Sequence, residues 1–258
     1  MICIAIANQK GGVGKTTTAI NIATAMAATG WRTLLIDLDP QGNASTGVGL
    51  RASERGLSSY DLLIGEASLA ECTVNSSIPG LDLVPATVDL SGAEVELVNV
   101  EDRAQRLRDA LDQHSGHDIC FIDCPPSLGL LTLNALSAAD TLMVPLQCEF
   151  FALEGLSQLL QTVEQVQQRF NADLSIVGVV LTMFDRRNRL TDQVSDDVRE
   201  CLGDLVFESV IPRNVRLSEA PSHGLPALIY DHACAGSRAY MALARELIGR
   251  LPERRKAA

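Results

Sequence analysis

A glycine-rich stretch near the amino terminus carries residue types that suit phosphate binding. Residues 4–17 read Ile-Ala-Ile-Ala-Asn-Gln-Lys-Gly-Gly-Val-Gly-Lys-Thr-Thr, an apolar strand that runs through a turn into a helix. Glycines let backbone N–H groups face an anion, and a helix N-terminus adds its dipole. In this pattern Lys15 reaches the β- and γ-phosphates and the Thr16 hydroxyl ligates Mg²⁺, whereas a βα turn that binds nothing is the alternative. The predicted phosphate-binding residues are Lys10, Gly11, Gly12, Val13, Gly14, Lys15, Thr16 and Thr17.

The loop departs from the usual pattern in two ways. The pattern G-x-x-x-x-G-K-[ST] has glycine where this chain has Gln9, and a second lysine, Lys10, precedes the paired glycines. This additional cation can serve local packing. It can also reach the phosphates of a nucleotide in a second copy of the chain, as an arginine finger supplied in trans does.

Three aspartates at the ends of apolar runs are candidates for metal binding and catalysis. At the end of one run, Asp123 can hold Mg²⁺ through its water shell, or it can cap the next turn. Asp37 and Asp39 end another run. Strand alternation puts both on the same side, so periodicity alone does not choose between them. Asp39 is the nearer to the carboxyl end of its strand and therefore to the expected γ-phosphate.

Apolar strands that alternate with amphipathic helices provide the scaffold for these residues. The alternation predicts an α/β fold, with one domain built on a mostly parallel, twisted sheet covered by helices on both faces. The candidate residues then meet at the carboxyl edge of the sheet. Residues 40–57, rich in Gly, Ser and Asn, are expected to form a mobile functional loop. Predicted strands are 2–7, 33–38, 81–84, 118–122, 141–146, 176–182 and 206–211, and predicted helical segments are 16–29, 59–64, 68–72, 91–113, 129–138, 153–170, 191–202 and 237–251.

Composition narrows the class of protein. The net charge of −11 argues against a generally basic nucleic-acid binder. However, residues 1–179 hold 9 Lys/Arg and 21 Asp/Glu, whereas residues 180–258 hold 12 and 11, so DNA contacts are expected in the last third. No apolar run reaches the ~18 residues of a membrane span, and we expect no signal peptide. The seven cysteines lack a C-x-x-C pair and indicate structural thiols in the cytoplasm.

The motifs together resemble the deviant P-loop ATPases of the ParA/MinD family, and most closely the chromosome-partitioning ParA (Soj) branch. The early lysine of that family stands at Lys10. The resemblance covers residues 2 to about 248 and includes four blocks in the correct order. These are residues 8–18, Asp-Leu-Asp-Pro-Gln-Gly-Asn at 37–43, Ile-Asp-Cys-Pro-Pro-Ser at 122–127, and Val-Ile-Pro-Arg-Asn-Val-Arg-Leu-Ser-Glu-Ala-Pro-Ser at 210–222.

The resemblance implies roles for individual residues. Asp39 is expected to position the attacking water. Many fast ATPases have a water-activating glutamate at the position that follows the strand-end aspartate, where this chain has Cys124, so hydrolysis should be slow. The Mg²⁺ ligands implied are Thr16, Asp39 and Asp123. The segment Pro212, Arg213 and Asn214 is expected to contact the adenine of ATP. The DNA-binding arginines of ParA proteins fall on Arg187 and Arg216. The sequence alone does not decide whether the nearby Arg186, Arg189 and Arg213 also contact DNA or are solvated.

The resemblance also implies partners. Two copies are expected to close over ATP–Mg²⁺, hold nonspecific DNA on the nucleoid, and separate after hydrolysis stimulated by a ParB-like centromere-binding protein. A membrane-cycling division-site regulator of the MinD kind is the main alternative, but it needs an amphipathic C-terminal helix. Here residues 1–251 are expected to form the ATPase domain, and 252–258 form a short basic tail that begins with proline and lacks an apolar face. We therefore expect no membrane contact.

Overall fold

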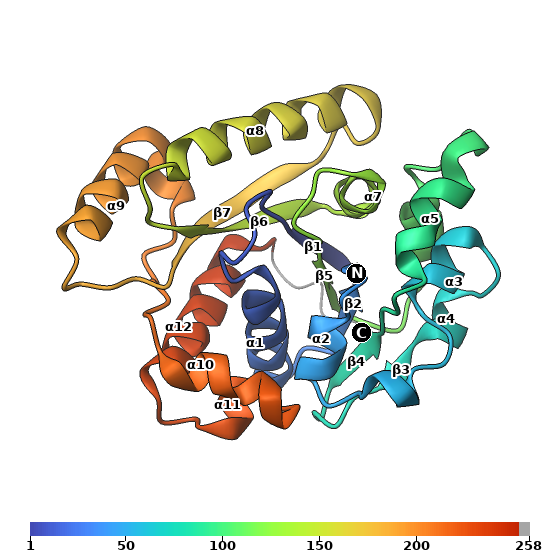
Figure 1. The fold of residues 1–258 in the computed structure, drawn as a ribbon, viewed down its shortest axis with the longest axis horizontal. Helices are drawn as coiled ribbons and strands as arrows, with labels where there is room; N and C mark the ends of the chain where they lie inside the picture. Colours follow the sequence, from blue (N-terminus) through green and yellow to red (C-terminus); the bar gives the residue numbers. More distant parts are fainter. Residues whose placement is uncertain (253–258) are drawn as a thin grey trace.

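The central strands are short and almost wholly apolar, because both faces of the sheet are covered. The computed structural model describes residues 1–252 and shows the strands surrounded by helices (Figure 1). The strands are β1 (Ile2–Ile6), β2 (Thr33–Asp37), β3 (Val74–Asn75), β4 (Leu81–Val84), β5 (Ile119–Asp123), β6 (Thr141–Gln147) and β7 (Ser175–Thr182).

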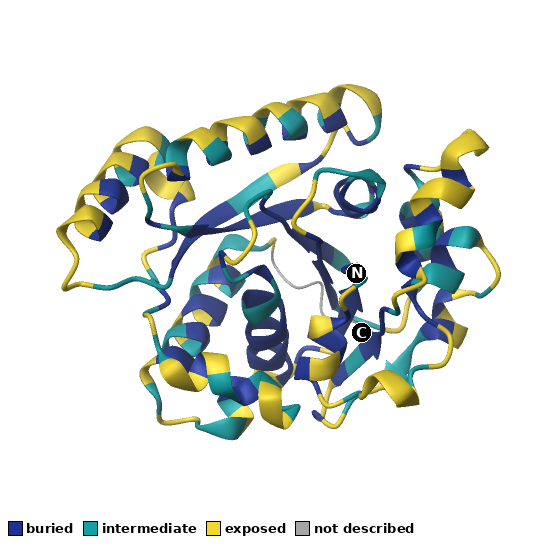
Figure 2. Cartoon of the chain, in the orientation of Figure 1, coloured by how far each residue is buried: buried dark blue, intermediate teal, exposed yellow. Residues whose placement is uncertain are grey.

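Helices connect the strands and are amphipathic where they lie on the surface. Figure 2 shows this for the long helix α8, which has buried residues on one side and exposed residues on the other. The α-helices are α1 (Lys15–Ala28), α2 (Asn43–Gly47), α3 (Ser59–Ile64), α4 (Leu69–Cys72), α5 (Leu90–Glu96), α6 (Arg106–Asp112), α7 (Leu130–Ala138), α8 (Ala152–Arg169), α9 (Arg189–Leu202), α10 (Val215–Glu219), α11 (Ala227–Tyr230) and α12 (Ala235–Arg250). Short 3₁₀ turns are η1 (Ala52–Glu54), η2 (Leu97–Asn99), η3 (Gly203–Leu205) and η4 (Ala220–His223).

Within residues 1–252 the sheet has seven strands in the order β3-β4-β2-β5-β1-β6-β7. Its pairs are parallel except for the one between β3 and β4 at the edge. The register aligns Asp123 at the end of β5 with Ile6 of β1 and with Asp37 of β2. The turns that follow these strands therefore leave the sheet side by side, as expected for a parallel α/β site.

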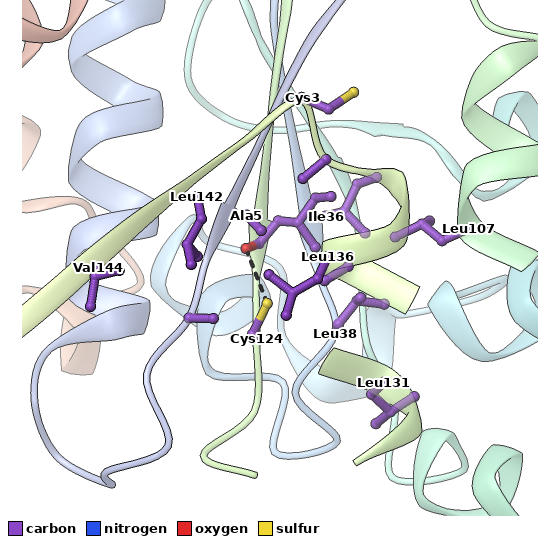
Figure 3. Packing of buried hydrophobic residues seen from close by; sticks show 14 of the residues in the cluster. Cys3, Ala5, Ile36, Leu38, Leu107, Cys124, Leu131, Leu136, Leu142 and Val144 are labelled. Carbon is purple, nitrogen blue, oxygen red and sulfur yellow. Dashed lines mark hydrogen bonds between the residues drawn. The ribbon is translucent and has the colours of Figure 1, made fainter. Parts of the chain in front are cut away.

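Two hydrophobic clusters, one on each face of the sheet, form the core. One contains residues of α1 and α12, and the other contains residues of α3 to α9. Figure 3 shows part of the second cluster, in which Cys124 lies near Leu38 and Leu136, whereas Cys3 lies toward the opposite end of the strands. The prediction of one α/β domain with helices on both faces is confirmed. No helix of residues 1–252 is long and apolar enough to span a bilayer.

One predicted strand, residues 206–211, is wrong. The segment runs beside β7 and makes only an isolated bridge between Val206 and Val179. The Glu246 carboxylate of α12 explains the interruption, because it accepts hydrogen bonds from the N–H groups of Glu208 and Ser209 at 2.8 and 2.9 Å. These two N–H groups therefore do not donate hydrogen bonds to a neighbouring strand.

Other local features also differ from the predictions. Residues 40–57 contain α2 and η1, which the loop assignment missed, and β3, α10 and α11 were not predicted either. These elements are two to five residues long, too short for a hydrophobic period to develop. The predicted tail, apart from Pro252, lies outside the described residues.

Candidate nucleotide site

The loop between β1 and α1 is held open by hydrogen bonds from distant parts of the chain. The Asn8 side chain donates to the Pro145 carbonyl at 2.8 Å and accepts from the Lys10 N–H at 3.0 Å. The Thr182 hydroxyl donates to the Val13 carbonyl at 2.7 Å. Gly12 and Gly14 have φ of +77° and +87°, values that favour glycine. The loop is therefore shaped before any ligand arrives.

Lys15 lies at the bottom of this loop, at the first position of α1. Its ammonium donates to the Lys10 carbonyl at 3.0 Å, and its residue is 6% exposed. Burial lowers the pKa of Lys15, and the nearby Asp123 carboxylate opposes that shift. A buried cation whose hydrogen-bond partner among the described residues is a neutral carbonyl is well placed to bind an incoming phosphate.

A cavity of about 360 Å³ opens above the loop. It is lined by Gly11, Gly12, Gly14, Lys15, Thr16, Thr17, Asp39, Gln41, Asn43, Pro126 and Met183. Most of the predicted phosphate-binding residues thus come together. Of the remaining two, Val13 is buried beneath the loop, and the side chain of Lys10 points elsewhere.

The structure distinguishes the two carboxylates that follow β2. Asp37 is fully buried, and it accepts hydrogen bonds from the Ser45 N–H and hydroxyl at 2.8 and 2.7 Å and from the Asp39 N–H at 3.2 Å. Burial raises the pKa of Asp37 to about 6, against the opposing effect of these bonds. Asp39 lines the cavity and accepts one bond, from the Gln41 N–H at 3.0 Å. Asp37 therefore anchors α2, and Asp39 faces the site.

Asp123 is fully buried at the end of β5, near Lys15 and Thr16, which line the cavity. Neither of its carboxylate oxygens has a hydrogen-bond partner among the described residues, although the Thr16 hydroxyl is near enough to favour the ionised form. Burial raises the pKa of Asp123, and the charge of Asp37 adds to that shift. A buried carboxylate with unsatisfied oxygens beside a hydroxyl is a donor set that suits Mg²⁺. The residues present therefore fit the predicted metal.

Lys10 turns away from the cavity. Its ammonium forms an ion pair with Glu149, in the turn after β6, and the two side chains are 41% and 43% exposed. The neighbouring Phe150 and Phe151 are also exposed, at 77% and 64%. The side chain of Lys10 is thus partly exposed and does not line the phosphate cavity of its own chain.

A second cavity, of about 430 Å³, adjoins the first and shares Gly14, Thr17 and Met183 with it. Pro212, Arg213 and Asn214 line this cavity together with Tyr240. The Asn214 Oδ1 accepts from the Arg216 N–H at 2.9 Å and caps α10, so its amide N–H₂ stays available for a ligand. The segment expected to contact a base therefore lies beside the phosphate cavity.

The two arginines predicted to bind DNA are both paired with acids. The Arg187 guanidinium donates twice to Asp185, at 2.9 Å each, and this lowers the pKa of Asp185 to about 2. Arg216 binds Glu219 at 2.8 Å and lies 3.5 Å from Asp231.

Comparison with known proteins identifies the family of the chain. A family model described as an AAA domain matches residues 1–176. The chromosome partitioning protein ParA of Caulobacter vibrioides is 58% identical over 97% of this chain and 95% of its own length. The chain belongs to the ParA/Soj family of chromosome-partitioning ATPases. The sporulation initiation inhibitor protein Soj of Bacillus subtilis is 51% identical over 95% of this chain and 97% of its own.

A solved structure extends the comparison to the fold. Cobyrinic acid a,c-diamide synthase from Mycobacterium smegmatis, with a bound ATP analogue and magnesium, is 38% identical with a TM-score of 0.83. The alignment covers 95% of this chain and 93% of that one. The resemblance to ParA/Soj proteins inferred from the motifs is confirmed.

Sequence reasoning missed several features of this ParA-family site. From its place after a predicted strand, Glu149 can face the nucleotide, a dimer interface or solvent, but nothing in the sequence links it to Lys10. Met183 stands between the two cavities and is the single non-glycine residue with positive φ in residues 1–252, at +50°. Its sequence context, directly after an apolar strand, carries no signal of that conformation. Gln41 and Pro126 lie within the recognised motif blocks, but only the fold shows that they line the cavity.

Proposed function

We propose that this ParA-family ATPase is a DNA-segregation switch. ATP and Mg²⁺ bind at the loop, two copies close face to face over the nucleotides, and the dimer holds nonspecific DNA. Slow hydrolysis then returns monomers that release DNA, and a ParB-like partner accelerates this step. The cargo is chromosomal or plasmid DNA.

The position of Lys10 is the observation that carries the proposal. Its ammonium lies outside the phosphate cavity of its own chain and is paired with a half-exposed Glu149. An exposed ion pair contributes only ~0–1 kcal/mol, so exchanging Glu149 for a partially desolvated phosphate is favourable. A lysine in this position supports contact with a nucleotide bound by a second copy.

The chain's own residues divide the work at the nucleotide. Lys15 and the loop N–H groups bind the phosphates, and Thr16, Asp39 and Asp123 are the proposed Mg²⁺ ligands, directly or through water. Mg²⁺ supplies positive charge that offsets the charge of the phosphates. Asp39 accepts a hydrogen bond from the attacking water and orients it. Pro212, Arg213 and Asn214 contact the adenine.

DNA contact is proposed for the surface that carries Arg187 and Arg216. In an acidic chain a few local cations give weak, salt-dependent binding, and two copies on one dimer multiply it. Glutamate at either position should abolish DNA retention and leave ATP-dependent dimerisation intact, as measured by electrophoretic mobility and light scattering. The double variant Asp185→Asn/Arg187→Gln removes one ion pair at constant net charge. DNA retention should be lost if Arg187 contacts phosphate directly and kept if Arg187 only neutralises Asp185.

The decisive experiment measures binding to unrelated duplex DNA sequences with ATP, with ADP and without nucleotide. We expect the chain to retain every DNA sequence in the presence of ATP, and none of them with ADP or without nucleotide. If the chain binds no DNA under any of these conditions, the segregation proposal fails.

A further inference from the structure

The second cavity, of about 430 Å³ and lined by Pro212, Arg213 and Asn214, is called the base cavity below. A surface hollow of about 500 Å³ lies next to it and shares Pro212 with it. The segment after β7 forms one side, where Phe184 and Pro212 make a parallel bridge. The beginning of α12 forms the other side, with Ala235 and Arg238. These two segments are far apart in the sequence and adjacent in the fold (Figure 1).

The hollow has a basic rim and an apolar floor. Arg186 and Arg238 are the charged residues among those that line it, and the other lining residues, which include Phe184 and Pro212, are apolar. Both arginines are exposed, and neither guanidinium makes a hydrogen bond or an ion pair with another described residue. In residues 1–252 no carboxylate lines this hollow.

The contrast with the neighbouring arginines is informative. Arg187 is held by Asp185, and Arg216 by Glu219, so binding a phosphate at either residue requires an existing ion pair to be broken or shared. Arg186 and Arg238 carry no such cost and keep their full electrostatic attraction for an anion. Two guanidinium groups beside an apolar surface match a nucleic-acid backbone, in which charged phosphates alternate with apolar faces of the sugars.

We propose that this hollow is a binding site for the DNA backbone, in which Arg186 and Arg238 contact phosphate oxygens and the floor packs against deoxyribose. The proposal rests on the nonspecific DNA binding proposed above and adds residues to it. Because Pro212 forms a wall of both the hollow and the base cavity, the site lies directly behind the segment expected to contact the adenine. This arrangement gives nucleotide binding a short structural route to the DNA surface.

The test compares Arg186→Gln and Arg238→Gln with Arg169→Gln. Arg169 is exposed near the end of α8 and, like the other two, makes no ion pair with a described residue, so the net charge changes equally. Affinity for a random-sequence duplex is measured with a non-hydrolysable ATP analogue and Mg²⁺ over a range of salt. Each hollow variant should weaken binding about tenfold, and the magnitude of the log K against log salt slope should fall by about 0.9 for each phosphate that the variant leaves unneutralised. Arg169→Gln should leave both unchanged.

The charge-retaining variants Arg186→Lys and Arg238→Lys complete the test. They should keep the salt slope of the native chain, because lysine still binds phosphate as a point charge. Light scattering and thermal melting should be unchanged in all five variants. If Arg186→Gln and Arg238→Gln bind DNA as Arg169→Gln does, the proposed site is wrong even though DNA binding stands. If the native chain itself binds no DNA, the failure lies in the proposed function.

Discussion

At the scale of single residues, the site depends on which polar groups already have partners. Asp37 accepts three hydrogen bonds and is committed to holding α2. Asp39 accepts one bond and lines the cavity, and Asp123 has no hydrogen-bond partner among the described residues. Unsatisfied buried groups are costly, so they indicate where a ligand compensates them. By this criterion we propose Asp39 and Asp123 as the functional carboxylates.

Replacing Lys15 with alanine should weaken ATP binding about 10- to 100-fold. The variant loses a charge-assisted hydrogen bond to phosphate, worth about 1.5–3 kcal/mol. Isothermal titration calorimetry measures the change directly, with Arg169→Ala as the control. An affinity equal to that of the native chain would contradict the assigned role of Lys15.

Asp39→Ala should retain ATP binding and dimerisation, remain on DNA, and lose about a hundredfold or more in turnover. Closure depends on phosphate contacts, whereas hydrolysis also needs an oriented water. Asp37→Asn is the informative comparison, because it disturbs the hydrogen bonds to Ser45 and should lower the melting temperature. Normal turnover in Asp39→Ala would show that another group positions the attacking water.

At the scale of elements, the segment after β2 is fixed by one arginine. The Arg55 guanidinium donates to the Gly42 and Leu50 carbonyls, to the Thr46 hydroxyl and, across to residues that follow β4, to the Ala86 carbonyl. The distances lie between 2.7 and 3.2 Å. Together with the Asp37–Ser45 bonds, these contacts hold α2 and thereby the turn that carries Asp39. These contacts tie together part of residues 40–57, a segment that its composition alone predicts to be a mobile loop.

Arg55→Ala should destabilise the chain by about 1–3 kcal/mol, because partly buried carbonyls lose their donors. Backbone amide hydrogen exchange should accelerate in residues 42–50, and turnover should fall more than ATP affinity. Arg51→Ala is the matched control, since Arg51 pairs only with Glu54 and its side chain is 79% exposed. Equal exchange rates in the two variants would show that Arg55 does not hold this segment.

At the scale of the whole molecule, Lys10 forms an ion pair with Glu149, and the next two residues in the chain are exposed phenylalanines. Phe150 and Phe151 follow Glu149 directly and pack edge-to-face against each other, with ring centroids 5.0 Å apart. An apolar pair beside a weak ion pair suits a surface that a second copy covers when nucleotide is bound. The dimer proposed for this ATPase would close on this face.

Lys10→Ala should still bind ATP but form no ATP-dependent dimer and show no hydrolysis, because in the proposed dimer this lysine contacts the nucleotide of the other copy. Light scattering measures dimerisation, and mixing with Lys15→Ala tests the trans role. Glu149→Gln is the control, because it frees Lys10 without removing it and should preserve the dimer. A normal dimer formed by Lys10→Ala alone would refute the contact between subunits.

The phosphate-binding loop, the family and the α/β architecture were all predictable from sequence. Phosphate binding in Gly14, Lys15 and Thr16 depends on neighbouring backbone groups, and buried parallel strands leave a clear apolar pattern. These are local properties, so consecutive residues encode them. The loss of the predicted strand at 206–211 shows the limit, since Glu246 removes its donors from a distant helix.

Only the tertiary structure decided which polar groups are free. Asp37 and Asp39 are equivalent by periodicity, but Ser45 reaches only the first. Arg186 and Arg187 are adjacent in the chain and both exposed, yet Asp185 forms an ion pair with Arg187, and Arg186 has no such pair with a described residue. Hydrogen-bond satisfaction is set by three-dimensional distance and by burial, which bring together residues from separate segments. The sequence alone therefore predicts the chemistry of the site, and packing determines which residues perform it.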